Sequence, residues 1–167
     1  MVLFTGGDAR LENMKHYAVR HEIVEWWTKP GQPTFNAAFG AEMYTDEDKK
    51  VALAKGVGRV TEEALDRGRP PRTWCEIPRE NSRSRERAYG KHPAMKPLDI
   101  CERFIQVHSN PADLVIIPFA GSGSEVLTAA KLGREAVGFE THTEYIELVK
   151  KRFAGHSVQL TTVEAEE

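Results

Sequence analysis

The clearest alternation of apolar and polar positions lies in the C-terminal third of the chain. Between residues 98 and 109 apolar side chains recur at helical spacing, which predicts a helix with Leu98, Cys101 and Ile105 on one face. The run LVIIPF at residues 114–119 is short and apolar throughout. A run of that kind is typical of a strand buried on both faces of a parallel sheet.

Three further elements follow this run. AGSG at residues 120–123 ends the strand, and SEVLTAAKLG at 124–133 predicts a helix that stops at a glycine. AVGFE at 136–140 predicts a second apolar strand, and 144–153 predicts the last helix. A strand, a helix and a strand in this order form a β-α-β unit of an α/β fold, for which a right-handed crossover is expected.

The front of the chain has a weaker pattern. VLF near the start and HEIVEWWTK at 21–29 predict two strands joined by a helix. Residues 46–66 are rich in charge and predict one or two short helices, because Gly56 and Gly58 weaken a continuous one. We interpret 1–167 as a single domain made of later sheet strands (1–35), a target-recognition or insertion region (36–90), a cofactor-binding β-α-β part (91–160) and an acidic tail (161–167).

Composition restricts the class of protein. A length of 167 residues, a mean hydropathy of −0.49 and a net charge of −2 fit one soluble domain. No run reaches the ~18 apolar residues of a membrane helix, and MVLFTGGDAR is not a secretory leader. Two cysteines cannot build a disulfide framework, so we expect a cytoplasmic protein.

The charge is uneven along the chain. Residues 79–96 carry six basic side chains against two acidic ones, and we call this stretch the basic segment. A local excess of this kind can hold phosphates although the whole chain is slightly acidic. The alternative interpretation is an ordinary solvated loop. The residues expected to contact nucleic acid are Arg79, Arg83, Arg85, Arg87 and Lys91.

The glycine-rich turn is the strongest chemical signal. It lets the backbone approach a ligand closely, and the following helix presents free N–H groups. Glu140 ends the next strand 17 residues beyond Gly123, near the ~20-residue spacing at which a carboxylate binds ribose hydroxyls. This favours an adenosine-containing cofactor. The dinucleotide fingerprint needs a glycine where Val126 stands, which disfavours an oxidoreductase, and no Gly-Lys-Ser/Thr follows, which excludes a P-loop.

These residues carry a family resemblance. The stretch HPAMKPLDICERFIQVHSNPADLVIIPFAGSGSEVLTAAKLGREAVGFETHTEYIELVKKRF, residues 92–153, resembles the C-terminal part of the amino-group DNA methyltransferases. These enzymes transfer a methyl group from S-adenosylmethionine to adenine N6 or cytosine N4. The upstream chain resembles the family more weakly, in the arrangement with the catalytic half first. The resemblance implies a Rossmann-like methyltransferase sheet, double-stranded DNA as partner, and a restriction-modification or phage enzyme.

The resemblance also assigns roles to residues. It implies that Glu140 holds the ribose and that Lys96 and Pro97 form another wall of the pocket. His92 lies in the same His-Pro box, and we interpret it as structural. No metal site is expected. The turn that cradles the methionine part of the cofactor consists of Phe119, Ala120, Gly121, Ser122, Gly123 and Ser124.

Two departures from the family pattern have consequences. Ile117 stands where members usually have an acidic residue near the methionine end, which implies weaker cofactor binding or another group in that place. The catalytic tetrapeptide, Asp/Asn/Ser-Pro-Pro followed by an aromatic, is absent from the 167 residues. In the family it lies before the strand that VLF resembles, so we expect a chain that begins after the catalytic strand, with no catalytic residue of its own.

The absent strand also affects the sheet. In the family it lies between the strands that LVIIPF and VLF resemble, so either these two pair directly or a second chain, in a homo-oligomer or a hetero-complex, supplies a strand. Two functions remain open from the sequence: a site-specific DNA methyltransferase, and a non-catalytic cofactor- or DNA-binding relative. An unrelated α/β oxidoreductase is the third alternative.

Overall fold

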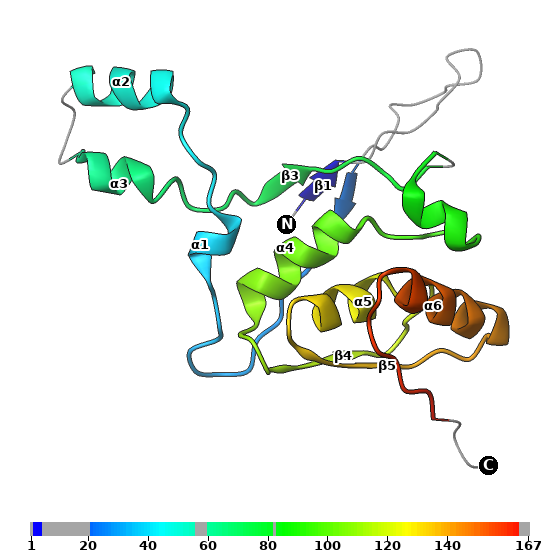
Figure 1. The fold of residues 1–167 in the computed structure, drawn as a ribbon. Helices are drawn as coiled ribbons and strands as arrows, with labels where there is room; N and C mark the ends of the chain where they lie inside the picture. The colour runs from blue at the N-terminus through cyan, green and yellow to red at the C-terminus, as the bar shows by residue number, and fades with distance from the viewer. Residues whose placement is uncertain (1, 5–20, 56–59, 82, 164–167) are drawn as a thin grey trace, which may run out of the picture.

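The computed structural model describes residues 2–4, 21–55, 60–81 and 83–163, and it contains helices and strands in an α/β arrangement (Figure 1). The C-terminal elements follow the predicted order closely. They are α4 (Leu98–His108), β4 (Leu114–Ile117), α5 (Ser124–Lys131), β5 (Glu135–Gly138) and α6 (Thr143–Gly155).

Helices cover one face of the C-terminal sheet. β4 and β5 pair in parallel, with Leu114 opposite Glu135 and Ile117 opposite Gly138. α4, α5 and α6 all lie on the same side of this pair (Figure 1). The predicted β-α-β unit is therefore confirmed.

The core of this unit is built from apolar side chains at helical spacing. In α5 the side chain of Leu127 is fully buried, because that face of the helix packs on the sheet and on α6. In α4 the predicted face is confirmed for Cys101 and Ile105, and Ile100 and Val107 are buried as well. Ala129 of α5 joins the α4 cluster, so the two helices share one core.

The prediction that LVIIPF is buried throughout is wrong. Ile117 is 8% exposed, whereas Leu114 is 56% and Ile116 58% exposed. Side chains alternate between the two faces of a strand, and among the described residues no helix covers the face opposite α5 (Figure 1). Val137 of β5 is exposed on the same uncovered face.

A second sheet holds the front of the chain, in the order β2-β1-β3. β1 (Val2–Phe4) pairs antiparallel with β2 (His21–Ile23) and parallel with β3 (Trp74–Glu76). β2 is shorter than predicted, β3 was not predicted, and the helix expected between β1 and β2 lies outside the described residues. Because β1 pairs with β2 and β3, it does not pair with β4: direct closure of the gap does not occur among the described strands.

A projecting pair of helices fills part of the predicted recognition region. After α1 (Ala37–Gly40), which packs on α4, α2 (Asp46–Lys55) and α3 (Glu62–Asp66) lie side by side away from the two sheets (Figure 1). Of the one or two short helices expected over residues 46–66, the structure has two. α2 has no buried residue, and Lys49 of α2 forms an ion pair of 2.7 Å with Asp66 of α3.

Candidate functional site

The turn after β4 has a backbone that only glycine adopts without strain. Gly121 has φ +52° and Gly123 has φ +73°, both in the left-handed region. A Cβ atom on Gly123 would lie 2.7 Å from Cγ2 of Val149 in α6. The turn is therefore packed tightly against α6, and α5 begins directly after it.

The side chains of the turn differ sharply in exposure. Ala120, Ser122 and Ser124 are buried, and Ser124 is completely so. Phe119 is 90% exposed, which is unusual for an aromatic ring. The turn thus has a rigid inner side and one open aromatic face at the carboxyl end of β4, the edge at which open α/β sheets bind ligands.

Glu140 connects this turn to the end of β5. Its Oε2 accepts a hydrogen bond of 2.8 Å from the Gly121 N–H, and its Oε1 accepts from the N–H groups of Thr141 at 2.8 Å and His142 at 2.9 Å. These N–H groups, that of His142 above all, hold the pKa of the Glu140 carboxyl below its ordinary value. Its Oε1 also lies 3.2 Å from His142 Nδ1, whereas Oε2 has the Gly121 N–H as its one hydrogen-bond partner among the described residues. The site thus carries a negative charge, and its free acceptor capacity is on Oε2, since each carboxylate oxygen has about two lone-pair positions.

The predicted second wall also lies at the turn. The Ser124 hydroxyl donates a hydrogen bond of 2.8 Å to the Lys96 carbonyl, and the Lys96 ammonium forms an ion pair of 2.8 Å with Glu125. The structure thus brings Lys96 and Pro97 together with the turn and Glu140, which come from three separate stretches of sequence.

His92 packs over the turn rather than pointing into open space. Its Nε2 lies 3.0 Å from the position that a Cβ of Gly121 would take, and its ring meets Tyr145 edge-on at 4.5 Å between centroids. Burial lowers the pKa of His92. Its Nδ1 accepts the Ala94 N–H, so the neutral ring has ordinary packing and hydrogen-bonding roles, in agreement with the structural interpretation.

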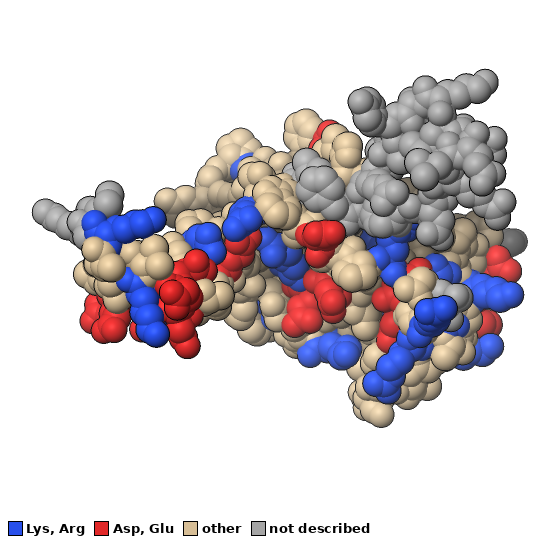
Figure 2. Space-filling view, turned by 90° about the horizontal axis from the view of Figure 1, so that it is seen from above, with Lys and Arg blue, Asp and Glu red and all other residues tan. Residues whose placement is uncertain are grey.

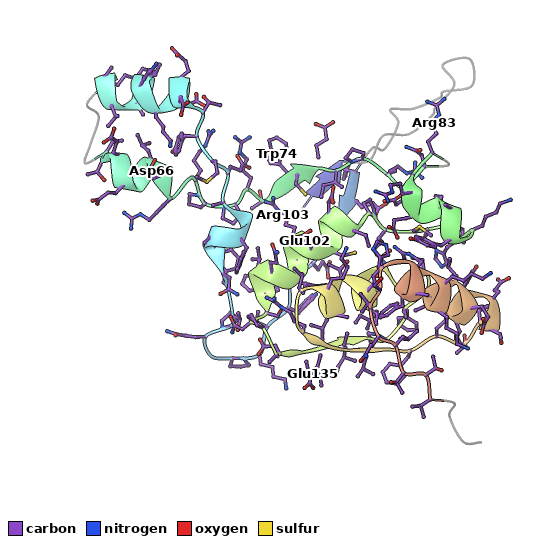
Figure 3. All side chains as sticks on the ribbon, in the orientation of Figure 1. Asp66, Trp74, Arg83, Glu102, Arg103 and Glu135 are labelled. Atoms are coloured by element: carbon purple, nitrogen blue, oxygen red, sulfur yellow. The ribbon has the colours of Figure 1, made fainter. Side chains whose placement is uncertain are left out.

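The basic side chains of the basic segment differ in exposure and in hydrogen bonding. Arg83 and Arg85 are exposed, and Figure 3 shows Arg83 pointing away from the body of the molecule. Arg79 and Lys91 are exposed too. Arg87 instead turns inward and donates to the carbonyls of His92 and Glu80. For contact with phosphates, Arg87 is therefore the least available of the five predicted residues.

Figure 2 shows Lys and Arg beside Asp and Glu at both ends of the molecule. Within α2 and α3, six acidic side chains stand against three lysines, a net charge of −3. Phosphates repel carboxylates, so this net-acidic pair is less suited than the basic segment to the backbone of a nucleic acid. The acidic side chains on this pair are Asp46, Glu47, Asp48, Glu62, Glu63 and Asp66.

A cavity of about 710 Å³ lies beside the edge of β4 with which no other described strand pairs. It is lined mainly by apolar groups, including Trp26, Phe35 and Phe104 together with the exposed Leu114 and Ile116. Trp26 and Phe35 lie 5.7 Å apart between ring centroids. This cavity separates the two sheets at the place where the family resemblance implies an additional strand.

One buried side chain at the turn, that of Arg152, was not predicted from the sequence. Arg152 of α6 is fully buried and donates to the carbonyl of Ser122. The signal was present, because helical spacing places Arg152 on the same face as Leu148 and Val149. An arginine on the apolar face of a predicted helix indicates a buried polar contact.

The cysteines, and the residue types that bind metals, provide no further candidate site among the described residues. Both cysteines are free thiols, and burial raises the pKa of Cys101 to about 12, so that it stays protonated and unreactive. Within the described ranges, no group of His, Cys, Asp or Glu side chains could hold a metal ion. None of the described helices is long and apolar enough to cross a membrane.

The sequence matches one family of known proteins. The family model for DNA methylase of the N6/N4 type matches residues 8–151. The type II methyltransferase M2.LlaDCHI of Lactococcus lactis subsp. cremoris is 40% identical over 67 residues, which are 40% of this chain and 25% of that protein. M.ScaI of Streptomyces caespitosus is 27% identical over 154 residues, 91% of this chain and 49% of that protein.

Among solved structures, the complex of M1.HpyAVI with SAM is 42% identical, covering 33% of this chain and 27% of that chain, with a TM-score of 0.32. The chain spans about half or less of the length of the curated relatives it matches.

Proposed function

The chain belongs to the N6/N4 DNA methylase family, and from this premise we propose that it forms the cofactor- and DNA-binding portion of a site-specific DNA methyltransferase of a restriction-modification system. The reaction moves a methyl group from S-adenosylmethionine to an exocyclic amino group, adenine N6 or cytosine N4. The observation that carries the proposal is the Glu140 carboxylate, held against the Gly121 turn at the carboxyl end of the parallel pair.

The residues of the site fit the cofactor chemically. Glu140 accepts three backbone N–H bonds, two of them on Oε1 beside the His142 ring, and its Oε2 keeps acceptor capacity for ribose hydroxyls. The turn from Phe119 to Ser124 cradles the methionine part, and its glycines let the backbone fit closely between the His92 ring and Val149. Lys96 and Pro97 close the pocket on the α4 side. S-adenosylmethionine supplies an activated methyl group on a sulfonium centre.

Base activation needs groups beyond these 167 residues. An exocyclic amino nitrogen is a poor nucleophile, so hydrogen-bond acceptors and an aromatic face must hold the flipped base in line with the methyl group. The sequence contains no Asp/Asn/Ser-Pro-Pro-aromatic tetrapeptide to provide them. The chain by itself therefore binds cofactor without catalysing transfer. Incubation with labelled cofactor and duplex DNA tests this, and transfer by the chain alone would contradict it.

A further strand on β4, supplied by a second chain, completes the sheet. Two features support this: the edge of β4 that is left open among the strands that the structure describes, and the apolar cavity beside it. An open strand edge is a template for pairing. A synthetic apolar strand ending in Asp-Pro-Pro-Tyr is the probe. It should shift the fluorescence of Trp26, which lines the cavity, and a Trp26→Phe variant should lose that change. A spectrum unaffected by the peptide would contradict strand addition.

Cofactor binding is tested by calorimetric titration with S-adenosylmethionine. We expect Glu140→Ala to weaken binding about tenfold or more, equivalent to ~1.4 kcal/mol, because a charge-assisted hydrogen bond contributes ~1.5–3 kcal/mol. The matched control is Glu135→Ala, an exposed glutamate at the other end of β5 (Figure 3). Unchanged affinity in Glu140→Ala would remove this residue from the site.

DNA binding is tested by its salt dependence. Changing Arg83, Arg85 and Lys91 to Gln should lower the slope of log K against log salt by ~0.9 for each phosphate that the protein no longer neutralises. The control changes Lys50 and Lys55 of α2 to Gln, in the net-acidic α2–α3 pair. If the slope is the same in both variants, the basic segment is an ordinary solvated loop.

A further inference from the structure

A buried arginine holds the inner side of the cofactor turn. The guanidinium of Arg152 is fully buried, and its Nη1 donates to the Ser122 carbonyl and, at 3.0 Å, to the Ser124 hydroxyl. The Ser124 hydroxyl donates its own hydrogen to the Lys96 carbonyl. One side chain of α6 thereby fixes the turn and, through Ser124, the wall formed by Lys96.

Glu86 neutralises this arginine from a different part of the chain. It lies on η2 (Arg85–Tyr89), inside the basic segment, and its Oε2 accepts from Arg152 Nη2 at 2.6 Å and Nε at 2.9 Å. Its Oε1 lies 2.8 Å from His156 Nε2. Burial alone would raise the pKa of Glu86, but Arg152 and His156 outweigh it, so the pKa lies below its ordinary value and the carboxylate stays charged.

Close packing, in addition to the ion pair, holds η2 against α6. A Cβ atom on Gly155 would clash with the Tyr89 ring, so only glycine lets this ring sit against the end of α6. The Tyr89 and His156 rings lie 5.8 Å apart between centroids. The geometry of Glu86 relative to Arg152 is therefore set by close packing on both sides.

Stability alone does not explain a buried ion pair. Removing two charges from water is costly, and apolar side chains of similar volume are often as stabilising or more so. An apolar side chain in place of Arg152 could fill the space, but it could not hold the Ser122 carbonyl. What the pair provides beyond packing is a fixed direction for the backbone of the turn.

We propose that Arg152 and Glu86 are positioning residues: Arg152 holds the Ser122–Ser124 backbone in the shape that binds cofactor, and Glu86 holds Arg152 in place from the basic segment. Neither touches the cofactor. This inference rests on the proposed cofactor site and gives a role to two residues that the family resemblance did not assign to it. Its consequence is that cofactor affinity can fall while the fold stays intact.

The deciding experiment is a double substitution. Glu86→Gln with Arg152→Met removes both buried charges, so the Tm should recover most of what either single change loses. The Ser122 carbonyl still lacks its donor, so the Kd for S-adenosylmethionine should stay at least about tenfold above that of the unmodified chain. If the Tm and the affinity recover together, the pair is merely structural and the proposal is overturned.

A single conservative change covers the case in which the double variant does not fold. Arg152→Lys keeps the charge beside Glu86, but one ammonium cannot reproduce the planar fork, so affinity should fall about tenfold with a small change in Tm. Unchanged affinity would overturn the proposal. Glu147→Gln, which breaks an exposed ion pair with Lys150 on the same helix, is the control and should bind normally.

The outcome for the unmodified chain separates the two proposals. If it binds no S-adenosylmethionine, the proposed function itself is wrong and the positioning role falls with it. If it binds and the variants bind equally well, only the positioning role is wrong.

Discussion

The C-terminal β-α-β unit and the α2–α3 pair both contain helices with charged side chains, yet the two regions are held together in different ways. In the unit, α5 has five buried residues and its side chains interlock with both strands and with α6. In the pair, α2 has none, and α3 buries Leu65 alone. The contact between α2 and α3 includes the exposed Lys49–Asp66 ion pair.

This difference explains where the candidate chemistry lies. A binding turn needs a backbone whose shape is fixed by its surroundings, and the turn after β4 is fixed by glycine geometry, by Val149 and by Arg152. An acidic pair of helices joined by exposed polar contacts cannot fix a ligand in that way. Three pairs of substitutions test this account, in order from the largest expected effect to the smallest.

Core truncation should separate the two regions most clearly. Leu127→Ala removes a fully buried side chain and should lower the free energy of unfolding by ~2–5 kcal/mol. Leu53→Ala on α2, where the side chain is 40% exposed, should change it by less than ~0.5 kcal/mol. Denaturant unfolding followed by circular dichroism measures both. Equal losses would mean that α2 is packed more tightly than its exposure indicates.

The two ends of α5 provide a finer test. Gly123 precedes the helix and Gly133 follows it, and both have a φ near +74°, so an alanine at either position costs about 1 kcal/mol in backbone strain. Only at Gly123 does the new Cβ meet Val149, at 2.7 Å, whereas at Gly133 nothing lies within 4 Å. Gly123→Ala should therefore cost a further ~1–3 kcal/mol.

Calorimetric titration of these two variants with S-adenosylmethionine also measures the effect of each change on cofactor affinity. Gly123→Ala should weaken S-adenosylmethionine binding, because relief of the clash displaces the turn, while Gly133→Ala should bind as the unmodified chain does. Equal cofactor affinities in the two variants would show that the turn tolerates displacement.

Much of this unit could be predicted from the sequence, and little of the rest. Apolar periodicity located α4, β4, α5, β5 and α6, because these elements bury one face each and the pattern records that burial. The same reasoning failed for Leu114 and Ile116, since an apolar strand carries no information on whether its second face is covered. β3 was missed because Trp74–Glu76 is too short for a pattern and pairs with residues far away in sequence.

In the candidate site, the sequence singled out the glycines and Glu140, because their spacing has a physical meaning on its own, and their cofactor-binding roles stay predictions. The Glu86–Arg152 pair joins residues 66 positions apart, and only the fold brings them together. For Arg87 the sequence was misleading. Its charge predicted contact with phosphates, but its guanidinium points inward and donates hydrogen bonds to two backbone carbonyls.

The smallest expected effect is on the loss of stability at acidic pH. The pKa of Glu140 is held below its ordinary value by backbone N–H groups, that of His142 first, so the stability it contributes is complete above pH ~4.3 and is lost as the pH falls through the lowered pKa. Glu140→Gln should flatten this acid-side decline in the denaturant midpoint. Glu135→Gln should keep it, and an unchanged slope in Glu140→Gln would contradict the assignment of these hydrogen bonds.

The central claim, that the turn of the C-terminal unit is the cofactor site and the α2–α3 pair takes no part in it, is tested most directly by NMR. Amide signals of Gly121 and Thr141, whose N–H groups bind Glu140, should shift saturably on titration with S-adenosylmethionine, while those of α2 should stay in place. Signals that do not move at Gly121 and Thr141 at saturating cofactor, or equal shifts in α2, would contradict the account.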